Sequence, residues 1–474
     1  MTRPPESGPG ARPALPGRGT RPSAQRRGPR PDVARRAAYD VVAAVRTTDA
    51  YANLVLPRLL RQQRIAGRDA AFATELAYGT LRAQGTLDAI LGRCVDRPVS
   101  TLDGAVLDVL RLGAYQLLRT RVAPHAAVSA TVDLARSVTS AGPAKLVNAV
   151  LRRVSEHDYP GWLDLVAPAF DQDPIGALAT RHSHPRWVAQ AFCDALGGDV
   201  EETAAALSAD DERPQVHLAA RPGRVDRDEL VAASGGRAGP WSPYAVRLDG
   251  GDPGAIAAVR DSRAQVQDEG SQLVALALAA APLTGRDTRW LDLCAGPGGK
   301  AALLGGLAAA RGAEVTAVEL HEHRAALVAG ATAGLPVEVR VADGREIDGD
   351  FDRVLVDAPC TGLGALRRRP EARWRRQPAD VPPLARLQRE LLTAALRVTR
   401  PGGLVAYITC SPHLAETRAV VDDAVRAGTA TWRDARPELP GVPDLGDGPW
   451  VQLWPHRHGT DAMFLALLAP ADAG

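Results

Sequence analysis

The chain has few cysteines, few aromatic residues and almost no lysine. Five of its 474 residues are cysteine, 4% are aromatic, and only two of the 57 basic residues are lysine. The cysteines form no Cys-x-x-Cys pair and have no zinc-type spacing, so neither a disulfide framework nor a metal site is expected. Such scarcity of cysteine in a large chain is typical of a reducing compartment, which predicts a cytoplasmic protein.

Long apolar runs are also missing. The longest uncharged apolar stretch lies near residues 273–283, well short of the roughly 20 residues that a membrane-spanning helix needs. The N-terminus is rich in arginine but lacks the apolar segment of a secretory signal. We therefore expect a soluble chain with no membrane partner, and we expect it to act as a monomer.

Positive charge is concentrated at the N-terminus. Residues 1–30 hold seven arginines against Glu6, whereas the formal charge of the whole chain is only +2, so the remainder is net negative. The folded part is thus not a globally basic nucleic-acid binder, and any such surface must be local. Residues 1–30 are mostly Pro, Gly and Arg, which predicts a disordered tail. The alternative is a non-specific tether to RNA phosphates.

The remaining residues divide by pattern into three units. In the first, apolar residues recur at helical spacing between Gly or Pro breaks, which predicts an all-α bundle. The second mixes short strand-like pieces with helices, which predicts a small α+β linking module. In the third, strands and helices alternate as in a doubly wound α/β sheet. The predicted units are residues 31–158, 159–265 and 266–470.

A glycine loop follows the first predicted strand of the third unit, Trp290–Leu293. Glycines at a strand-to-helix turn let the backbone approach a ligand, and the helix N-terminus favours negative charge. The loop lacks the Ser or Thr of a phosphate-binding Walker loop, because residue 301 is Ala, but it fits the looser dinucleotide fingerprint. Its residues are Cys294, Ala295, Gly296, Pro297, Gly298, Gly299 and Lys300.

Carboxylates and thiols follow the later strands. Glu319 ends the second strand, about 20 residues beyond the glycine loop, where an acid can accept both ribose hydroxyls. Asp343 follows the third strand and is placed for an adenine amino group. Asp357 and Cys360 follow the fourth, and Cys410 follows the fifth. Because ligands bind at the carboxyl ends of the strands in open α/β sheets, these residues predict one site.

Two thiols at the mouth of the sheet favour S-adenosylmethionine over a dinucleotide as the cofactor. Cytosine C5 accepts a methyl group only after a thiolate has added to C6, an acid near N3 stabilises that adduct, and a base removes the C5 proton. Asp357, Cys360 and Cys410 could supply these groups. The residues alone do not decide which thiol attacks, since a Pro-Cys nucleophile like that of DNA cytosine methyltransferases would be Cys360.

Three motifs resemble the Sun/Fmu-type RNA m5C methyltransferases: the glycine loop at 294–300, Asp357-Ala-Pro-Cys-Thr-Gly and Thr409-Cys410-Ser411. The helical unit in front of these motifs resembles the NusB-like RNA-binding domain over about 120 residues. Gly79-Thr80-Leu81-Arg82 is one of the segments that carry this resemblance. The combination is similar to bacterial 16S ribosomal RNA cytosine-C5 methyltransferases. It implies a Rossmann-like class I methyltransferase domain and an RNA substrate, for which ribosomal RNA is expected and transfer RNA is the alternative.

The resemblance also implies roles for single residues. Cys410 is the implied nucleophile and Cys360 assists resolution and product release. The implied cofactor contacts are the loop 294–300, Glu319, Asp343 and Asp357. Two other classes are weighed against this one: a nicotinamide-linked oxidoreductase, and a non-catalytic RNA-binding assembly factor with an idle site.

An arginine-rich run lies beyond Cys360. Six of the ten residues from 367 to 376 are Arg, accompanied by Trp374 and opposed only by Glu371. Arginines pair with phosphates and a tryptophan can stack on a base, so the run predicts an RNA contact. The alternative is a solvated run of charges.

Overall fold

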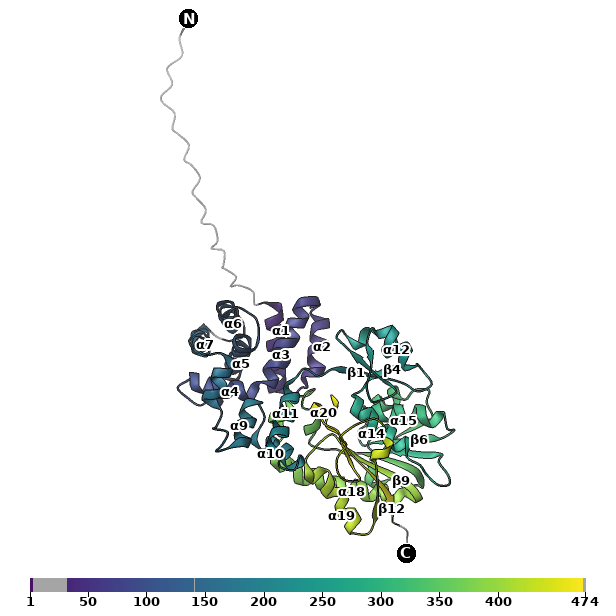
Figure 1. The fold of residues 1–474 in the computed structure, drawn as a ribbon. Helices are drawn as coiled ribbons and strands as arrows, with labels where there is room; N and C mark the ends of the chain where they lie inside the picture. Colours follow the sequence, from purple (N-terminus) through teal and green to yellow (C-terminus); the bar gives the residue numbers. More distant parts are fainter. Residues whose placement is uncertain (3–31, 140, 472–474) are drawn as a thin grey trace.

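A computed structural model describes residues 1–2, 32–139 and 141–471 of the chain. The predicted tail therefore lies outside the described residues, apart from its first two. An N-terminal helical domain, a middle segment and a C-terminal domain with a mixed sheet follow one another (Figure 1). The predicted fold class is confirmed. Within the described residues, no helix is both long and apolar enough to cross a membrane.

The N-terminal domain is a bundle of helices whose apolar stripes face one core. The side chains of Val41 and Val42 are buried there and that of Ala37 in a smaller cluster beside it, as the helical spacing predicts. Asp32 caps the first helix by accepting hydrogen bonds from two backbone N–H groups of its first turn. The helices are α1 (Val33–Thr48), α2 (Ala52–Gln62), α3 (Gly67–Arg82), α4 (Gln84–Cys94), α5 (Gly104–Arg119), α6 (Pro124–Val138) and α7 (Ala141–Val154).

The middle segment begins with four helices, α8 (Tyr159–Val166), α9 (Pro174–Arg181), α10 (Arg186–Ala195) and α11 (Val200–Asp211). Helices α9 to α11 share a core with Leu363 and Trp454 of the C-terminal domain, and α4 donates a hydrogen bond from Thr86 to α9. Since these helices pack against both neighbours, the exact bounds of the three units stay predictions. A small antiparallel sheet in the order β2-β3-β1-β4 follows. Its elements are β1 (Val216–Ala220), α12 (Arg227–Ser234), β2 (Arg237–Ala238), β3 (Ala245–Leu248), α13 (Ala257–Arg260) and β4 (Ala264–Val266).

The C-terminal sheet has the strand order β10-β12-β9-β8-β5-β6-β7, with β11 paired to β12. The five strands from β9 to β7 run parallel, whereas β12 is antiparallel to β9. Chain order reverses direction between β5 and β8, and such a switch point is where open α/β sheets bind ligands. The strands are β5 (Arg289–Asp292), β6 (Glu314–Glu319), β7 (Val337–Val341), β8 (Phe351–Asp357), β9 (Thr399–Thr409), β10 (Ala430–Arg433), β11 (Val451–Gln452) and β12 (Phe464–Pro470).

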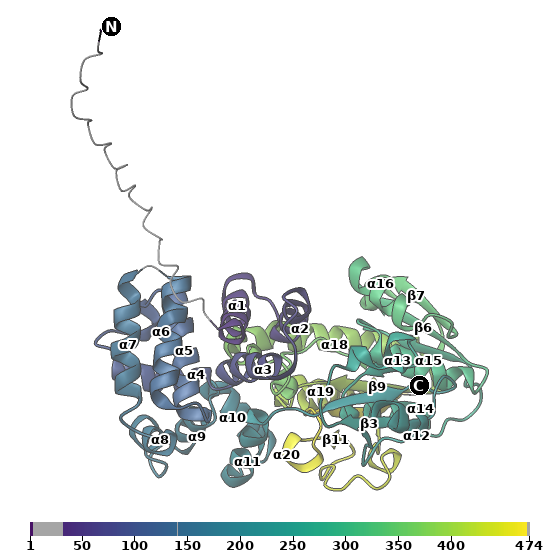
Figure 2. The same cartoon turned by 90° about the horizontal axis from the view of Figure 1, so that it is seen from above.

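Helices cover both faces of this sheet, and the central strands are therefore apolar on both sides (Figure 2). Within β8, Leu355 packs with α14 and α15, while Val354 and Val356 pack with α18 and α19 on the opposite face. The helices are α14 (Glu269–Ala280), α15 (Gly299–Ala309), α16 (Glu322–Ala331), α17 (Ala372–Arg375), α18 (Val381–Val398), α19 (Arg418–Arg426) and α20 (Pro455–His458).

Most arginines of the run from 367 to 376 bind residues in other parts of the chain and hold those parts together. The prediction of an RNA contact is therefore wrong for most of the run. Arg368 pairs with Asp268 and Asp461, and the buried Arg367 donates to a backbone carbonyl. The ring of Trp374 packs on Gly85 of α4, where an added Cβ would lie 2.3 Å from it. The sequence could not show this, because the partners lie about 90 to 290 residues away.

Arg373 is the most deeply placed residue of the run. Its fully buried guanidinium donates to the backbone carbonyls of Arg82 and Asp210, at 3.0 and 2.8 Å, and to the Asp211 carboxylate at 2.8 Å. It thereby ties the N-terminal domain, the middle segment and the C-terminal domain together.

Replacing Arg373 with alanine should lower the free energy of unfolding by about 3–5 kcal/mol, because a half-buried carboxylate and two backbone carbonyls lose a donor whose guanidinium is fully buried. Urea unfolding of the variant, beside Arg386→Ala at an exposed site on α18, measures this loss. The salt dependence of RNA binding should stay unchanged. A shallower salt slope in Arg373→Ala with intact stability would restore the RNA-contact interpretation.

Candidate active site

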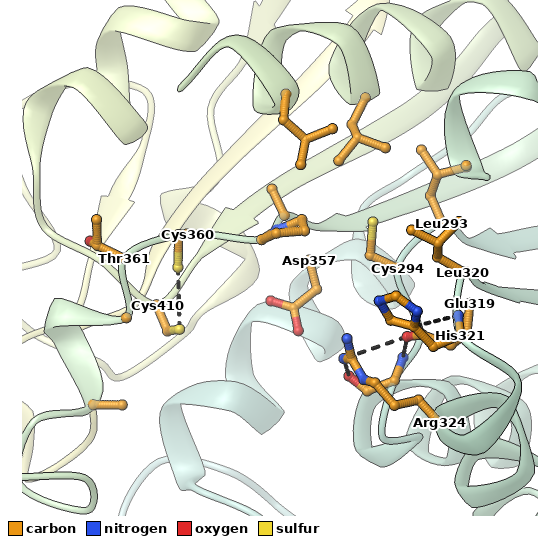
Figure 3. A pocket seen from close by; sticks show the side chains of 18 of the residues that line it. Leu293, Cys294, Glu319, Leu320, His321, Arg324, Asp357, Cys360, Thr361 and Cys410 are labelled. Carbon is orange, nitrogen blue, oxygen red and sulfur yellow. Dashed lines mark hydrogen bonds and ion pairs between the residues drawn. The ribbon is translucent and has the colours of Figure 1, made fainter. Parts of the chain in front are cut away.

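A cleft of about 740 Å³ opens at the carboxyl edge of the C-terminal sheet (Figure 3). Asp343 belongs to its lining, and Figure 3 shows Asp357 between Glu319 on one side and Cys360 and Cys410 on the other. Parallel strands end on the same edge of a sheet, which is why residues far apart in the chain meet here. The structure thus brings the predicted carboxylates and thiols into one site.

The two thiols lie next to each other because β8 and β9 are parallel neighbours. Asp357 is in register with Ile408, so the loop after β8 and the residue after β9 meet. The Sγ atoms of Cys360 and Cys410 are 3.4 Å apart, within hydrogen-bonding distance for sulfur. One thiol can therefore donate its proton to the thiolate of the other.

The surroundings of the two sulfurs differ. The hydrogen bond from Cys360 lowers the pKa of Cys410, and the nearby Lys300 ammonium lowers it further against burial and Asp357. The same hydrogen bond raises the pKa of Cys360 well above its ordinary value, and burial and the Glu416 carboxylate act in the same direction. Either sulfur could donate in this hydrogen bond, so the surrounding charges must separate the two thiols. A carboxylate lies near each of them, but the Lys300 ammonium acts on Cys410, which favours Cys410 as the thiolate and Cys360 as its donor.

Glu416 fixes the two cysteine-bearing loops to each other. Its fully buried carboxylate accepts hydrogen bonds from the N–H and hydroxyl of Thr361, at 2.8 and 2.5 Å, and from the hydroxyl of Ser411 at 2.7 Å. Thr361 follows Cys360 and Ser411 follows Cys410, so one carboxylate sets the distance between the two sulfurs. Nothing local in the sequence marks Glu416 as a functional residue, because its carboxylate acts on two separate loops.

Lys300 is directed at the reacting end of the cleft. Its Nζ donates to the Asp357 carboxylate at 2.8 Å, and only 11% of its side chain is exposed. Burial alone would lower the pKa of Lys300, but the Asp357 carboxylate outweighs burial and the pKa is raised. Lys300 therefore stays an ammonium ion beside Asp357 and within electrostatic reach of Cys410.

The glycine loop fits a ligand that reaches Glu319. Gly296 donates its backbone N–H to the Glu319 carboxylate at 3.1 Å, and a Cβ on Gly296 would lie 2.2 Å from that oxygen. Gly298 has φ +105°, a left-handed conformation that suits glycine. The backbone can approach the carboxylate only because residue 296 has no side chain. This arrangement suits the ribose end of S-adenosylmethionine.

Not all of the predicted cofactor residues face the cleft. Cys294 and Gly296 of the loop line it, as do Glu319 and Asp343. The carboxylate of Asp343 is already paired with the guanidinium of Arg345, through contacts of 2.6 to 3.1 Å. That pairing lowers the pKa of Asp343 and keeps it ionised. A contact from Asp343 to an adenine amino group would share the carboxylate with this arginine.

Other cleft residues escaped the sequence analysis. Leu320 and His321 directly follow Glu319, and Arg324 pairs with it at 3.4 Å. Asp292, the last residue of β5, does not line the cleft but is buried directly before Leu293 and Cys294, which do; burial, reinforced by the Asp357 carboxylate, raises the pKa of Asp292 to about 7. Its place as the last residue of the first strand was the signal that could have identified it.

Comparisons with known proteins agree along nearly the whole chain. The family described as 16S rRNA methyltransferase RsmB/F matches residues 278–469, and the NusB family matches residues 32–156. A Mycobacterium tuberculosis protein named as a methyltransferase is 61% identical, over 91% of this chain and 95% of that protein. The ribosomal RNA small subunit methyltransferase B of Salmonella typhi is 32% identical, over 91% and 97%.

Solved structures share the fold. PH0851 has a TM-score of 0.76 at 21% identity and covers 92% of this chain and 98% of its own. NSun6 from Pyrococcus horikoshii, solved with SFG, has a TM-score of 0.51 at 18% identity, over 60% and 98%. Fold, site and relatives together define an S-adenosylmethionine-dependent RNA m5C methyltransferase with an N-terminal NusB domain. The chain belongs to the RsmB/F family of 16S rRNA methyltransferases.

Proposed function

We propose that the protein methylates C5 of a cytosine in 16S ribosomal RNA, in the cytoplasm, through a covalent bond between Cys410 and C6 of the base. The observation that carries the proposal is the pair of sulfurs 3.4 Å apart beside the Lys300–Asp357 ion pair. The relatives named as ribosomal RNA small subunit methyltransferase B, from Salmonella typhi and Bacillus subtilis, support the choice of RNA.

The residues divide the reaction between them. The Cys410 thiolate adds to C6 as a protonated Asp357 donates its proton to N3 of the base, and the Lys300 ammonium stabilises the carboxylate that remains, which takes the proton back from N3 when the product forms. S-adenosylmethionine, when bound, supplies the methyl group to C5. The C5 proton then leaves to a base, the Cys410–C6 bond breaks to regenerate the thiolate, and Cys360 assists this release.

The cofactor end of the cleft has separate duties. Glu319 is placed to accept hydrogen bonds from the ribose hydroxyls, beside the backbone of the loop from Cys294 to Lys300. We assign the adenine to Asp343 and Leu320, which line the same cleft as Glu319. Lys300, the last residue of the loop, serves the other end of the cleft, where the cytosine reacts, because its side chain donates to Asp357.

Bisulfite mapping of RNA from a strain that lacks the gene tests the choice of substrate. We expect a cytosine of the small-subunit RNA to lose its methyl group and to regain it when the wild-type gene, but not Cys410→Ala, is supplied. Purified protein with S-adenosylmethionine should methylate the same cytosine in RNA from the deletion strain. Loss of methylation from a transfer RNA instead would overturn the proposed substrate.

A further inference from the structure

The N-terminal domain reaches into the catalytic cleft. Asp49 and Tyr51, from the loop between α1 and α2, line the same cleft as Cys410. Arg375 of the C-terminal domain holds this loop by donating to the backbone carbonyls of Val45 and Ala50, at 3.0 and 2.6 Å. The loop is therefore fixed at the cleft before any substrate arrives.

Tyr51 presents an aromatic ring between positive charges. The guanidinium carbons of Arg369 and Arg375 lie 5.1 and 5.3 Å from the centre of its ring, and 39% of the residue is exposed. Arg375 is occupied by the backbone of the loop. The exposed Arg369 guanidinium, by contrast, forms no hydrogen bond or ion pair with the residues that the structure describes.

Arg376 is the second arginine of the run with donors to spare. Its side chain lines the cleft and, among the described residues, makes one hydrogen bond, from Nε to the carbonyl of Thr361 at 3.1 Å. Carboxylates and backbone carbonyls already bind the guanidinium groups of Arg367, Arg368 and Arg373. Among the described residues, two of the six arginines thus line the cleft and keep donors available to a ligand, Arg369 and Arg376, and Arg376 donates to the residue that follows Cys360.

An exposed tyrosine ring beside uncommitted guanidinium groups matches a nucleotide of single-stranded RNA. Its base stacks on an aromatic ring, and its phosphate accepts hydrogen bonds from arginine. The target cytosine must leave its stack to reach a buried thiol, which places its neighbour in the strand near the cleft mouth.

We propose that Tyr51, Arg369 and Arg376 form a binding subsite for a nucleotide adjacent to the target cytosine. Its base stacks on Tyr51, and Arg369 moves off the ring to bind the phosphate together with Arg376. The subsite rests on the proposed function, because it presumes that an RNA strand enters this cleft. The N-terminal domain would then select the sequence or shape around the target and not only hold RNA at a distance.

Steady-state methylation of deletion-strain small-subunit RNA tests the subsite, together with the affinity of each variant for that RNA without cofactor. Tyr51→Leu should raise the KM for RNA about tenfold, as loss of one stacked base predicts. The kcat and the affinity for S-adenosylmethionine should change less than about twofold, since neither thiols nor cofactor residues are touched. Tyr51→Phe keeps the ring and should behave as wild type.

Arg369→Ala is the second variant, and its side chain is exposed, so folding is preserved. The slope of log affinity against log salt should become shallower by about 1. Arg386→Ala removes an exposed arginine that does not line the cleft and is the matched control; it should leave the slope unchanged.

The two proposals fail in different ways. Unchanged KM and RNA affinity in Tyr51→Leu, or an unchanged salt slope in Arg369→Ala, would overturn the subsite while the wild type still methylates the RNA. A wild type that binds the RNA but does not methylate it would overturn the proposed substrate, and the binding of the variants would still decide the subsite.

Discussion

Replacing Cys410 with alanine should abolish methyl transfer, with a loss of at least ~10⁴-fold in turnover, as expected when a covalent nucleophile is removed. Without addition at C6, C5 of cytosine is too weakly nucleophilic to accept the methyl group. The measurement is incorporation of labelled methyl from S-adenosylmethionine into small-subunit RNA. Binding of the cofactor should be retained, because the Cys410 sulfur lies at the other end of the cleft from Glu319.

Cys360→Ala is the matched variant, and the two thiols should fail differently. If Cys360 assists release, its loss leaves a protein–RNA adduct that persists on a denaturing gel, whereas Cys410→Ala forms none.

The rate of adduct formation should also depend on pH. The thiolate is present above the pKa of Cys410, which the Cys360 thiol lowers, so removing that donor should move the acid limb of the rate profile to higher pH.

The opposite pattern would reverse the roles. An adduct that persists in Cys410→Ala and is missing in Cys360→Ala would make Cys360 the nucleophile, as in the Pro-Cys arrangement of DNA cytosine methyltransferases. Neither sulfur is favoured by distance, since both belong to the same 3.4 Å contact. Charge is what favours Cys410 as the nucleophile, because the Lys300 ammonium acts on Cys410 whereas the Glu416 carboxylate acts on Cys360.

Much of the site was predictable because a parallel sheet converts sequence order into geometry. Glu319, Asp357 and Cys410 each stand at the end of an apolar run, and the ends of parallel strands share one edge. The sequence therefore sufficed to place them together. The residue pattern alone did not decide which thiol attacks. That choice depends on the groups around each sulfur, and these come from loops whose proximity no sequence pattern predicts.

Long-range side-chain partners were beyond the sequence. The run from 367 to 376 has the composition of an RNA-binding patch, yet Arg373 is fully buried against the middle segment and Arg375 holds a loop of the N-terminal domain. The composition of a segment shows how many charges it carries but not which acceptor groups in the fold bind them. Tyr51 shows the converse, since a lone tyrosine between two helices gave no signal until the fold placed it in the cleft.

Replacing Asp357 with alanine should cost both activity and stability. Turnover should fall about 10³-fold, in the range for loss of a proton-handling group. The free energy of unfolding should fall by about 3 kcal/mol, because Lys300 is left as a largely buried ammonium without the carboxylate 2.8 Å away. Methylation assays and urea unfolding of the same preparations measure the two losses.

A double substitution separates the two duties of Asp357. Lys300→Met combined with Asp357→Ala removes both charges, so most of the lost stability should return, because no unpaired buried ion remains. Activity should stay at the level of Asp357→Ala, since the group that serves the base is still missing. Recovery of turnover along with stability would show that Asp357 acts only by neutralising Lys300, and the proposed role at N3 would have to be given up.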